Sequence, residues 1–354
     1  MKEYAITNDG FGIHTFELII PYMGKNEMEA IVTRVYSEPT NDPYDDKDKC
    51  IAVRTDKYPC LRIRLYHNKH MRYIRVIVTA NRVLYPETDY LSILNENDDI
   101  ALLGTTLNNM LTDIFGEEYT LDRFSLSRID CCVNVMLSKD FSAERYVKLI
   151  SRSLYCRKDM IDGYDEDMDE NNKVRNKHGF RIRTDFGGFT AYDKYFQLED
   201  KKRNFNNISD ALLRIELMYK REHIYNTRKA NDIENNAETL EFYLHNSRSY
   251  FKEFICSRLL KGRYYTVKKM REIVNNSDLK KCEKKHALKH IEAQFYAKYY
   301  CGVVKKSKKV LKYELAFYNM LSNFERLDMS PISLSYRDKH GDDSVPSLYE
   351  LLGF

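Results

Sequence analysis

The chain has 354 residues, of which 43% are hydrophobic and 31% charged, a composition typical of a soluble globular protein with one large domain or two. Its apolar runs, such as residues 16–20, are far too short to cross a membrane, and the N-terminus has no apolar signal core. Eight cysteines are scattered without a CxxC pair, which argues against a disulfide framework or a zinc site. We therefore expect a cytoplasmic protein that does not contact a membrane.

The net charge of +4 is distributed unevenly along the chain. Residues 251–315 contain 18 Lys and Arg against 6 Asp and Glu, a local charge of +12, so the remainder carries −8. Such asymmetry indicates a region that faces a polyanion such as DNA. The candidate contacts are Lys268, Lys269, Lys280, Lys281, Lys284 and Lys285. The alternative, lysine-rich helices that are merely solvated, is equally compatible with the sequence.

The N-terminal part of the chain predicts an antiparallel sheet. Alternating or β-branched residues predict strands over 12–22, 29–37, 50–56, 60–67 and 72–79, with a loop at Pro39 and residues 41–43. A helix follows over 98–115, then a central strand over 126–136. Ser142 is expected to cap a helix that ends near residue 154.

The rest of the chain changes from strands to helices. Residues 158–177 are acidic, then basic, and predict a loop. Strands are expected over 178–184, 189–195 and 210–219, the first two joined by a turn at 185–188. Helical periodicity covers 221–232, 237–246, 248–260, 266–274, 278–300 and 308–325. The sequence therefore predicts an α+β fold, with an antiparallel-sheet domain over 1–220 and a basic, mostly helical domain over 221–354.

Two carboxylates lie inside predicted strands. In residues 126–136, alternation puts Arg128 and Asp130 on the face opposite Ile129, and Glu216 lies within another apolar strand. A carboxylate buried in a strand is costly unless it is paired or bound to a cation. Mg²⁺ or Mn²⁺ suits such oxygens and can polarise a phosphate. The alternative is a structural salt bridge, Asp130 with Arg214 or Glu216 with Arg128.

Tyr192 stands near the end of a third predicted strand, followed by Asp193 and Lys194. A tyrosyl oxygen becomes a nucleophile when a base, a cation or a nearby lysine assists its deprotonation. Strand tyrosines more often pack a core, so it is the combination with the two carboxylates that favours catalysis. Tyr195 is a second candidate hydroxyl.

Other chemistries lack their motifs. No His-hydrophobic-His triplet is present, and the pair His286 and His290 has Ala287 where a metalloprotease requires glutamate. No Walker A loop and no GxGxxG occurs, so neither nucleotide hydrolysis nor dinucleotide binding is supported.

Three short segments resemble the tyrosine-dependent replication initiators of Gram-positive plasmids and related phage or integrated elements, the Rep_trans-type replication initiation factors. They are Leu126-Ser-Arg-Ile-Asp130 with Val133-Asn134, Phe189-Thr-Ala-Tyr-Asp-Lys194 with Leu198-Glu199, and Leu213-Arg-Ile-Glu216, in the family's order. Residues 327–332 are similar to a C-terminal turn of some phage-borne members.

The resemblance implies a replication initiator that nicks one strand of origin DNA and stays attached through a 5′-phosphotyrosyl link. Tyr192 matches the nicking tyrosine, and Asp130 and Glu216 match positions that hold Mg²⁺ or Mn²⁺. Arg128, Lys194 and Arg214 would be supporting charges near the phosphate. A host helicase and a homodimer remain open as partners. The alternatives are a non-catalytic DNA-binding regulator with a degenerate initiator fold, and an interaction protein with solvated lysines.

Overall fold

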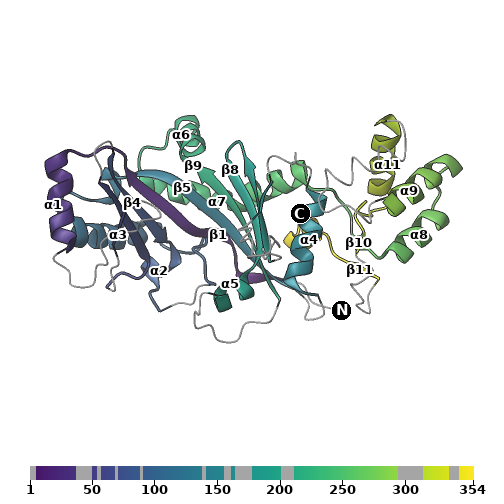
Figure 1. Cartoon of the computed structure of the whole chain (residues 1–354), viewed down its shortest axis with the longest axis horizontal. Helices are drawn as coiled ribbons and strands as arrows, with labels where there is room; N and C mark the ends of the chain where they lie inside the picture. The colour runs from purple at the N-terminus through teal and green to yellow at the C-terminus, as the bar shows by residue number, and fades with distance from the viewer. Residues whose placement is uncertain are drawn as a thin grey trace, which may run out of the picture.

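The computed structural model describes residues 5–36, 50–53, 57–67, 71–87, 91–137, 141–154, 161–163, 178–200, 211–293, 314–334 and 343–354. Within these ranges the fold is α+β, built on an antiparallel sheet with helices packed against it (Figure 1). The strands are β1 (Ala5–Ile20), β2 (Ile51–Val53), β3 (Leu61–His67), β4 (Arg72–Thr79), β5 (Ser125–Met136), β6 (Ile161–Gly163), β7 (Gly179–Thr184), β8 (Gly187–Asp193) and β9 (Leu212–Lys220). This is the fold class that the sequence predicts.

The described strands form one nine-stranded sheet in the order β2-β3-β4-β1-β5-β9-β8-β7-β6, with every neighbouring pair antiparallel. The strands β1, β5 and β9 are central, and β8 lies beside β9. The three segments that carry Asp130, Glu216 and Tyr192 are therefore neighbours in space, although the chain separates them by up to 86 positions.

One face of the sheet is apolar and covered by helices. Along β5, Ile129, Cys131, Val133 and Val135 are completely buried, and Leu213, Ile215 and Leu217 continue the layer on β9. The covering helices are α4 (Ala143–Ser153), α6 (Arg221–Ala230), α7 (Asn236–Arg258) and the short α12 (Leu348–Leu352), and α3 (Ile100–Phe115) packs against α7. Burial of this layer supplies the hydrophobic free energy that fixes the strand register, because a one-residue slip would turn every apolar side chain outward.

The helix starts follow local capping chemistry. Asp99 accepts a hydrogen bond from the Leu102 amide at the start of α3, and Ser142 accepts one from the Arg145 amide at the start of α4. These side chains satisfy backbone donors that the first helical turn leaves unpaired. Both helices were predicted from the sequence.

Three sequence predictions are wrong in detail. Residues 25–36 form helix α1 rather than a strand over 29–37, because Met28, Ile31 and Val35 recur at helical spacing and all three are buried. The predicted helices 237–246 and 248–260 are one continuous helix, α7. Part of the predicted loop 158–177 is a strand, β6, which pairs with β7. The loop at 39–43 and the predicted helical residues 294–300 and 308–313 lie outside the described residues.

A smaller helical group lies at one end of the molecule, at the right of Figure 1. It contains α8 (Val267–Asn276), α9 (Lys281–Ala293) and α11 (Glu314–Arg326), beside a two-stranded ribbon of β10 (Tyr264–Tyr265) and β11 (Ser344–Val345). Its core includes Met270, Ile291, Met320 and Phe324. None of the described helices combines the length and apolarity needed to cross a membrane.

Candidate functional site

The second face of the sheet is polar where β1, β5, β9 and β8 meet. The register pairs Cys132 with Glu216, Glu216 with Thr190, and Tyr192 with Arg214, which places Asp130, Glu216 and Tyr192 on the same face. The predicted site residues are therefore gathered on one surface, opposite the apolar core. Alternation along three strands is what separates this face from the core.

Tyr192 and Glu216 are in direct contact. The Tyr192 hydroxyl donates a hydrogen bond to Glu216 Oε1 at 2.7 Å, across neighbouring strands. Only 4% of Tyr192 is exposed, so the residue is buried in the polar face. A carboxylate that accepts a hydrogen bond from the phenolic hydroxyl is positioned to act as a general base.

Arg214 lies next to this pair, opposite Tyr192 in the β8–β9 register. It is fully buried, and its guanidinium donates to Asn134 Oδ1 at 2.7 Å and to the Leu91 carbonyl oxygen at 2.6 Å. Asn134 donates to the same carbonyl at 2.8 Å. Burial lowers the pKa of Arg214, but Tyr192, Cys132 and Glu216 outweigh that effect and raise it. Arg214 therefore places a fixed positive charge beside the tyrosine.

Asp130 is held on the same face of β5, one diagonal step from Glu216. Its Oδ2 accepts a hydrogen bond from the Thr15 hydroxyl and forms an ion pair with Arg128 at 3.0 Å. Burial raises the pKa of Asp130 to about 6, and the nearby Glu216 carboxylate adds to this shift while Arg128 opposes it. The salt bridges anticipated from sequence are replaced by others: Arg128 pairs with Asp130 and Glu17, and Arg214 bonds to Asn134.

His14 is a site residue that sequence reasoning missed. A register shift in β1 between Ile13 and Thr15 re-aims this side chain toward the polar face, where its Nδ1 lies 3.6 Å from Glu216 Oε1. Burial lowers the pKa of His14 well below its usual value, and Arg214, Lys194, Arg62 and Arg128 lower it further. The ring is therefore neutral near pH 7, and its contact with Glu216 is not an ion pair. A lone histidine in a strand-like run does not indicate from the sequence that its side chain will reach such a site.

The Tyr-Asp-Lys motif ends β8 and begins helix α5 (Lys194–Asp200). Asp193 Oδ1 accepts a hydrogen bond from the Phe196 amide at 3.1 Å, so this residue caps the helix. Lys194 is buried, donates to Gln197 at 2.8 Å, and lies 5.8 Å from the centre of the Tyr192 ring. The alternative hydroxyl, that of Tyr195, is on α5 and not on the strand.

The polar face fits a divalent cation in kind. Asp130 Oδ1 is buried and has no hydrogen-bond partner, and this orphaned carboxylate oxygen is a hard ligand of the type that Mg²⁺ prefers. Among the described residues, no group of three or more His, Cys, Asp or Glu is arranged to hold a metal ion. Asp130 and Glu216 could supply at most two carboxylate ligands to a Mg²⁺ or Mn²⁺ ion, and substrate phosphate and water would have to complete its coordination.

The six predicted DNA-contact lysines all lie in the helical group, on α8, α9 and the turn between them. Lys269 is paired with Glu272 at 2.9 Å, and Lys284 donates to the Asn275 carbonyl oxygen at 2.7 Å. The other four, Lys268, Lys280, Lys281 and Lys285, are exposed. Lys281 and Lys285 are four residues apart and share one face of α9.

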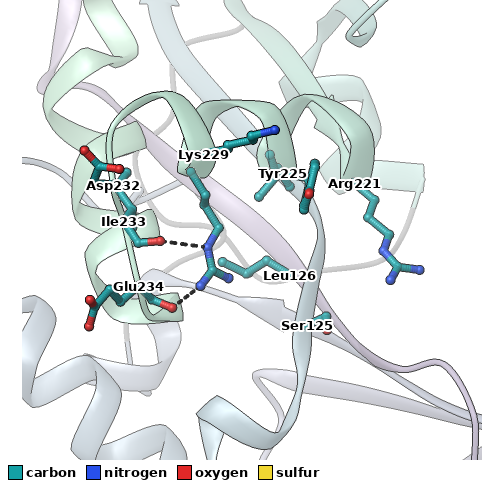
Figure 2. A pocket seen from close by; sticks show the side chains of 10 residues that line it. Ser125, Leu126, Arg221, Tyr225, Lys229, Asp232, Ile233 and Glu234 are labelled. Carbon is teal, nitrogen blue, oxygen red and sulfur yellow. Dashed lines mark hydrogen bonds between the residues drawn. The ribbon is translucent and has the colours of Figure 1, made fainter.

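A surface cavity lies elsewhere, between α6, the turn that follows it and the start of β5. It has a volume of about 640 Å³ and includes Ser125, Tyr225 and Lys229 in its lining (Figure 2). Arg228 in its wall donates to the carbonyl oxygens of Ile233 and Glu234, and so closes the turn between α6 and α7. The cavity is at the far end of β5 and β9 from Tyr192, so we assign it no role in the candidate site.

Comparison with known proteins gives only a distant likeness, to solved structures. No protein-family model matches the chain, and no curated protein matches it at a significant level. A solved structure of a rolling-circle replication initiator protein from Geobacillus stearothermophilus is similar over 65% of this chain and 80% of that one. The sequence identity is 11% and the TM-score 0.27, too low to support an argument about function.

Proposed function

We propose that this protein is a replication initiator of a plasmid, phage or integrated element, which nicks one DNA strand with Tyr192. The observation that carries the proposal is the hydrogen bond from the Tyr192 hydroxyl to Glu216, beside the buried guanidinium of Arg214. A strand tyrosine that only packed a core would need one hydrogen-bond partner for its buried hydroxyl, and would not need a buried guanidinium beside that partner. The three sequence segments that resemble Rep_trans-type initiators are the ones that supply these groups.

The proposed reaction is an in-line transesterification. Glu216 takes the phenolic proton as Tyr192 Oη attacks the phosphorus, the Oη–P bond forms, and the bond from phosphorus to the 3′ oxygen breaks. The leaving 3′ oxygen takes a proton from water and becomes a free 3′-hydroxyl for a polymerase. The DNA 5′ phosphate remains on Tyr192 as a phosphodiester, so later strand transfer needs no nucleotide hydrolysis.

The surrounding residues would stabilise charge during this step. Arg214 stabilises the developing phenolate, and its fixed hydrogen bonds to Asn134 and Leu91 mean that no reorganisation is required. A Mg²⁺ or Mn²⁺ ion bound at Asp130 and Glu216 would add Lewis-acid polarisation of the phosphate. Lys194 adds a further positive charge near the tyrosine ring.

The helical group is proposed to bind DNA outside the catalytic face. Helices α8 and α9 are joined by residues 277–280, a four-residue connection of the length found in helix-turn-helix units. The exposed Lys281 and Lys285 on α9 would meet duplex phosphates or the major groove.

The proposal is tested by trapping covalent adducts. Because a 5′-phosphotyrosyl link retains the DNA on the 3′ side of the nick, a 3′-labelled pool of hairpin oligonucleotides with randomised loops is mixed with the full chain and Mg²⁺. We expect a labelled, SDS-resistant band from the wild-type protein and from Tyr195→Phe, and none from Tyr192→Phe. An adduct that persists in Tyr192→Phe would overturn the assignment of the nucleophile.

One observation favours a second candidate function. Tyr192 is 4% exposed, and a hydroxyl that a phosphate cannot approach would leave a non-catalytic DNA-binding regulator with an initiator-like fold. That candidate predicts salt-dependent DNA binding with no covalent adduct from any member of the pool.

A further inference from the structure

The polar face continues from Tyr192 toward β3, the neighbour of the edge strand β2, as a row of arginines. The register pairs Arg64 with Arg75 across β3 and β4, and Glu17 with Arg128 across β1 and β5. Glu17 bonds to both neighbours, since it lies 2.5 Å from Arg75 and 3.8 Å from Arg128. We call the five residues Arg62, Arg64, Arg75, Arg128 and Arg214 the arginine row. The carboxylates of Glu17, Asp130 and Glu216 lie on the same face, so positive charges outnumber negative ones there.

The row changes from exposed to buried along its length. Arg62 is exposed, the side chains of Arg75 and Arg128 are 30% and 24% exposed, and Arg214 beside Tyr192 is completely buried. Burial is the main cause that lowers the pKa of His14, and Arg214, Arg62 and Arg128 lower it further, so these guanidinium groups are near enough to act on a residue that contacts Glu216. The arginines therefore form a charged path that begins at the exposed Arg62 on β3 and ends at Tyr192.

Two guanidinium donors in the row have no acceptor among the described residues. Arg75 Nε and Arg128 Nε are buried and make no hydrogen bond in the described structure. Buried donors are nearly always paired in folded proteins, and an unpaired one costs stability. Open donors on two strands of one face, β4 and β5, therefore point to an anionic ligand, and arginine is the residue best suited to phosphate.

A stacked pair of aromatic rings lies next to the row. Tyr66 and Tyr73 are paired across β3 and β4, two positions along from Arg64 and Arg75, so they share the polar face. Their ring centres are 4.1 Å apart and the rings nearly parallel at 9°. Tyr73 is half-buried and Tyr66 fully buried. Aromatic faces beside a basic groove are what proteins use to stack the bases of single-stranded nucleic acid.

We propose that the strand to be cut enters along this arginine row, as single-stranded DNA over β3, β4, β1 and β5, and not through the lysine-rich helices. The inference rests on the proposed function for the identity of the strand. Single-stranded DNA fits better than duplex because Tyr192 is buried, and an unpaired strand is flexible enough to bring a phosphate to it. The lysines of α8 and α9 would then bind the duplex beside the nick.

The test compares two double variants that remove the same formal charge. Arg62→Gln with Arg64→Gln alters the outer end of the row, and Lys281→Gln with Lys285→Gln alters α9. Binding of fluorescein-labelled dT20 and of a 20-base-pair duplex is measured by anisotropy across a salt series without Mg²⁺, so that no cleavage enters. Melting curves confirm that each variant is folded, and Arg62→Lys with Arg64→Lys separates loss of charge from loss of the guanidinium.

We expect the arginine variant to bind dT20 at least about fivefold more weakly, because it loses charge-assisted hydrogen bonds to phosphate. Its salt slope should fall by roughly 1.4, because each phosphate contact on a single strand contributes about 0.7. The lysine variant should keep its dT20 affinity within about twofold and lose duplex binding instead. Unchanged dT20 binding by the arginine variant, or equal losses in both variants, would overturn the path.

The result is separable from the nicking proposal. If no Tyr192 adduct ever forms but the arginine variant loses dT20 binding, the strand path stands and the nickase does not. If the adduct forms and saturating DNA does not restore its rate in the arginine variant, the row acts on the chemical step and not on strand entry, which also contradicts the proposal.

Discussion

Tyr192 and Glu216 show how two ordinary strand residues become a reactive pair. Glu216 lies between Ile215 and Leu217, Tyr192 lies between Ala191 and Asp193, and the polar group of either would be costly to bury alone. The β8–β9 register brings them together and places Arg214 opposite Tyr192. Asp130 on β5 is the diagonal neighbour of Glu216. The residue types and their spacing were readable from the sequence, but the hydrogen bond that joins two of them depends on a strand order the sequence does not state.

Glu216→Gln tests the role of the carboxylate. The amide oxygen still accepts a hydrogen bond from the Tyr192 hydroxyl, so the fold is kept, but the amide cannot take the proton. We expect the rate of adduct formation to fall by about 10²-fold or more, the usual contribution of a general base, with dT20 affinity unchanged. A Gln variant that forms adducts at the wild-type rate would remove Glu216 from the mechanism.

Asp130→Asn tests the buried carboxyl through the pH dependence of stability. Because burial raises the pKa of Asp130 to about 6, the folded state binds a proton more tightly than the unfolded chain does. The stability that protonated Asp130 contributes to the folded state is therefore complete below about pH 4 and is lost as the pH rises through 6. The variant should melt at nearly the wild-type temperature at pH 4 and be more stable at pH 7.5, by about 1–3 kcal/mol.

The readout for Asp130→Asn is the melting temperature of both proteins from pH 4 to pH 8. Arg128 keeps Glu17 as a partner in the variant, so no new unpaired charge is expected to mask the effect. A stability difference that does not change with pH would show that Asp130 titrates normally. Addition of Mg²⁺ at pH 7.5 should stabilise the wild-type protein more than the variant.

At the scale of elements, the irregular parts of β1 position the site. Ile13 exchanges backbone hydrogen bonds with Leu94, at 2.8 and 3.0 Å, and so fixes the segment whose Leu91 carbonyl holds Arg214. Gly12 allows this approach, because a Cβ at that position would lie 2.0 Å from the Leu94 carbonyl oxygen. The register shift next to it turns His14 toward Glu216.

Gly12→Ala should therefore damage the site from a distance. The added methyl group must push the Leu94 segment away, at a cost of about 1–3 kcal/mol, and the acceptor of Arg214 moves with it. We expect a lower melting temperature and slower adduct formation. Gly104→Ala on α3 is the matched control, since a Cβ there meets nothing within 4 Å, and it should leave activity unchanged. Equal behaviour of the two variants would contradict this role for the Leu94 segment.

Most regular elements could be predicted because periodicity and capping are local. The strands 60–67, 72–79 and 126–136 and the helix 98–115 follow from patterns within a few residues. The helix α1 was mistaken for a strand because its β-branched residues favour β structure, and tertiary burial of one helical face overrides that preference. His14 and the Leu94 segment could not be predicted, because both depend on a bulge and on a bridge between distant residues.

At the scale of the whole molecule, the C-terminal residues return to the sheet. Helices α6 and α7 pack on β5, and Phe354 at the end of the chain stacks on Phe11 of β1 with ring centres 5.9 Å apart. The predicted boundary at residue 220 stays a prediction, but the core of the sheet includes side chains from both sides of it. A deletion that began at residue 251 would remove part of this core.

Leu352→Ala measures that dependence. Leu352 is completely buried on α12, so its truncation should lower the free energy of unfolding by about 2–5 kcal/mol. We expect faster amide hydrogen exchange in β1, which α12 contacts, and not only in the last turn of the chain. Exchange confined to residues 343–354 would mean that the C-terminal segment is independent of the sheet.

The central claim is that Tyr192 is the residue that becomes covalently joined to DNA. The most direct measurement is mass spectrometry of the trapped adduct after protease and nuclease digestion. The account predicts one modified peptide, with a nucleotide phosphate on the side chain of Tyr192, and unmodified peptides containing Tyr195. A nucleotide on Tyr195 or on any other side chain, or no modified peptide from a pool that the protein binds, would contradict it.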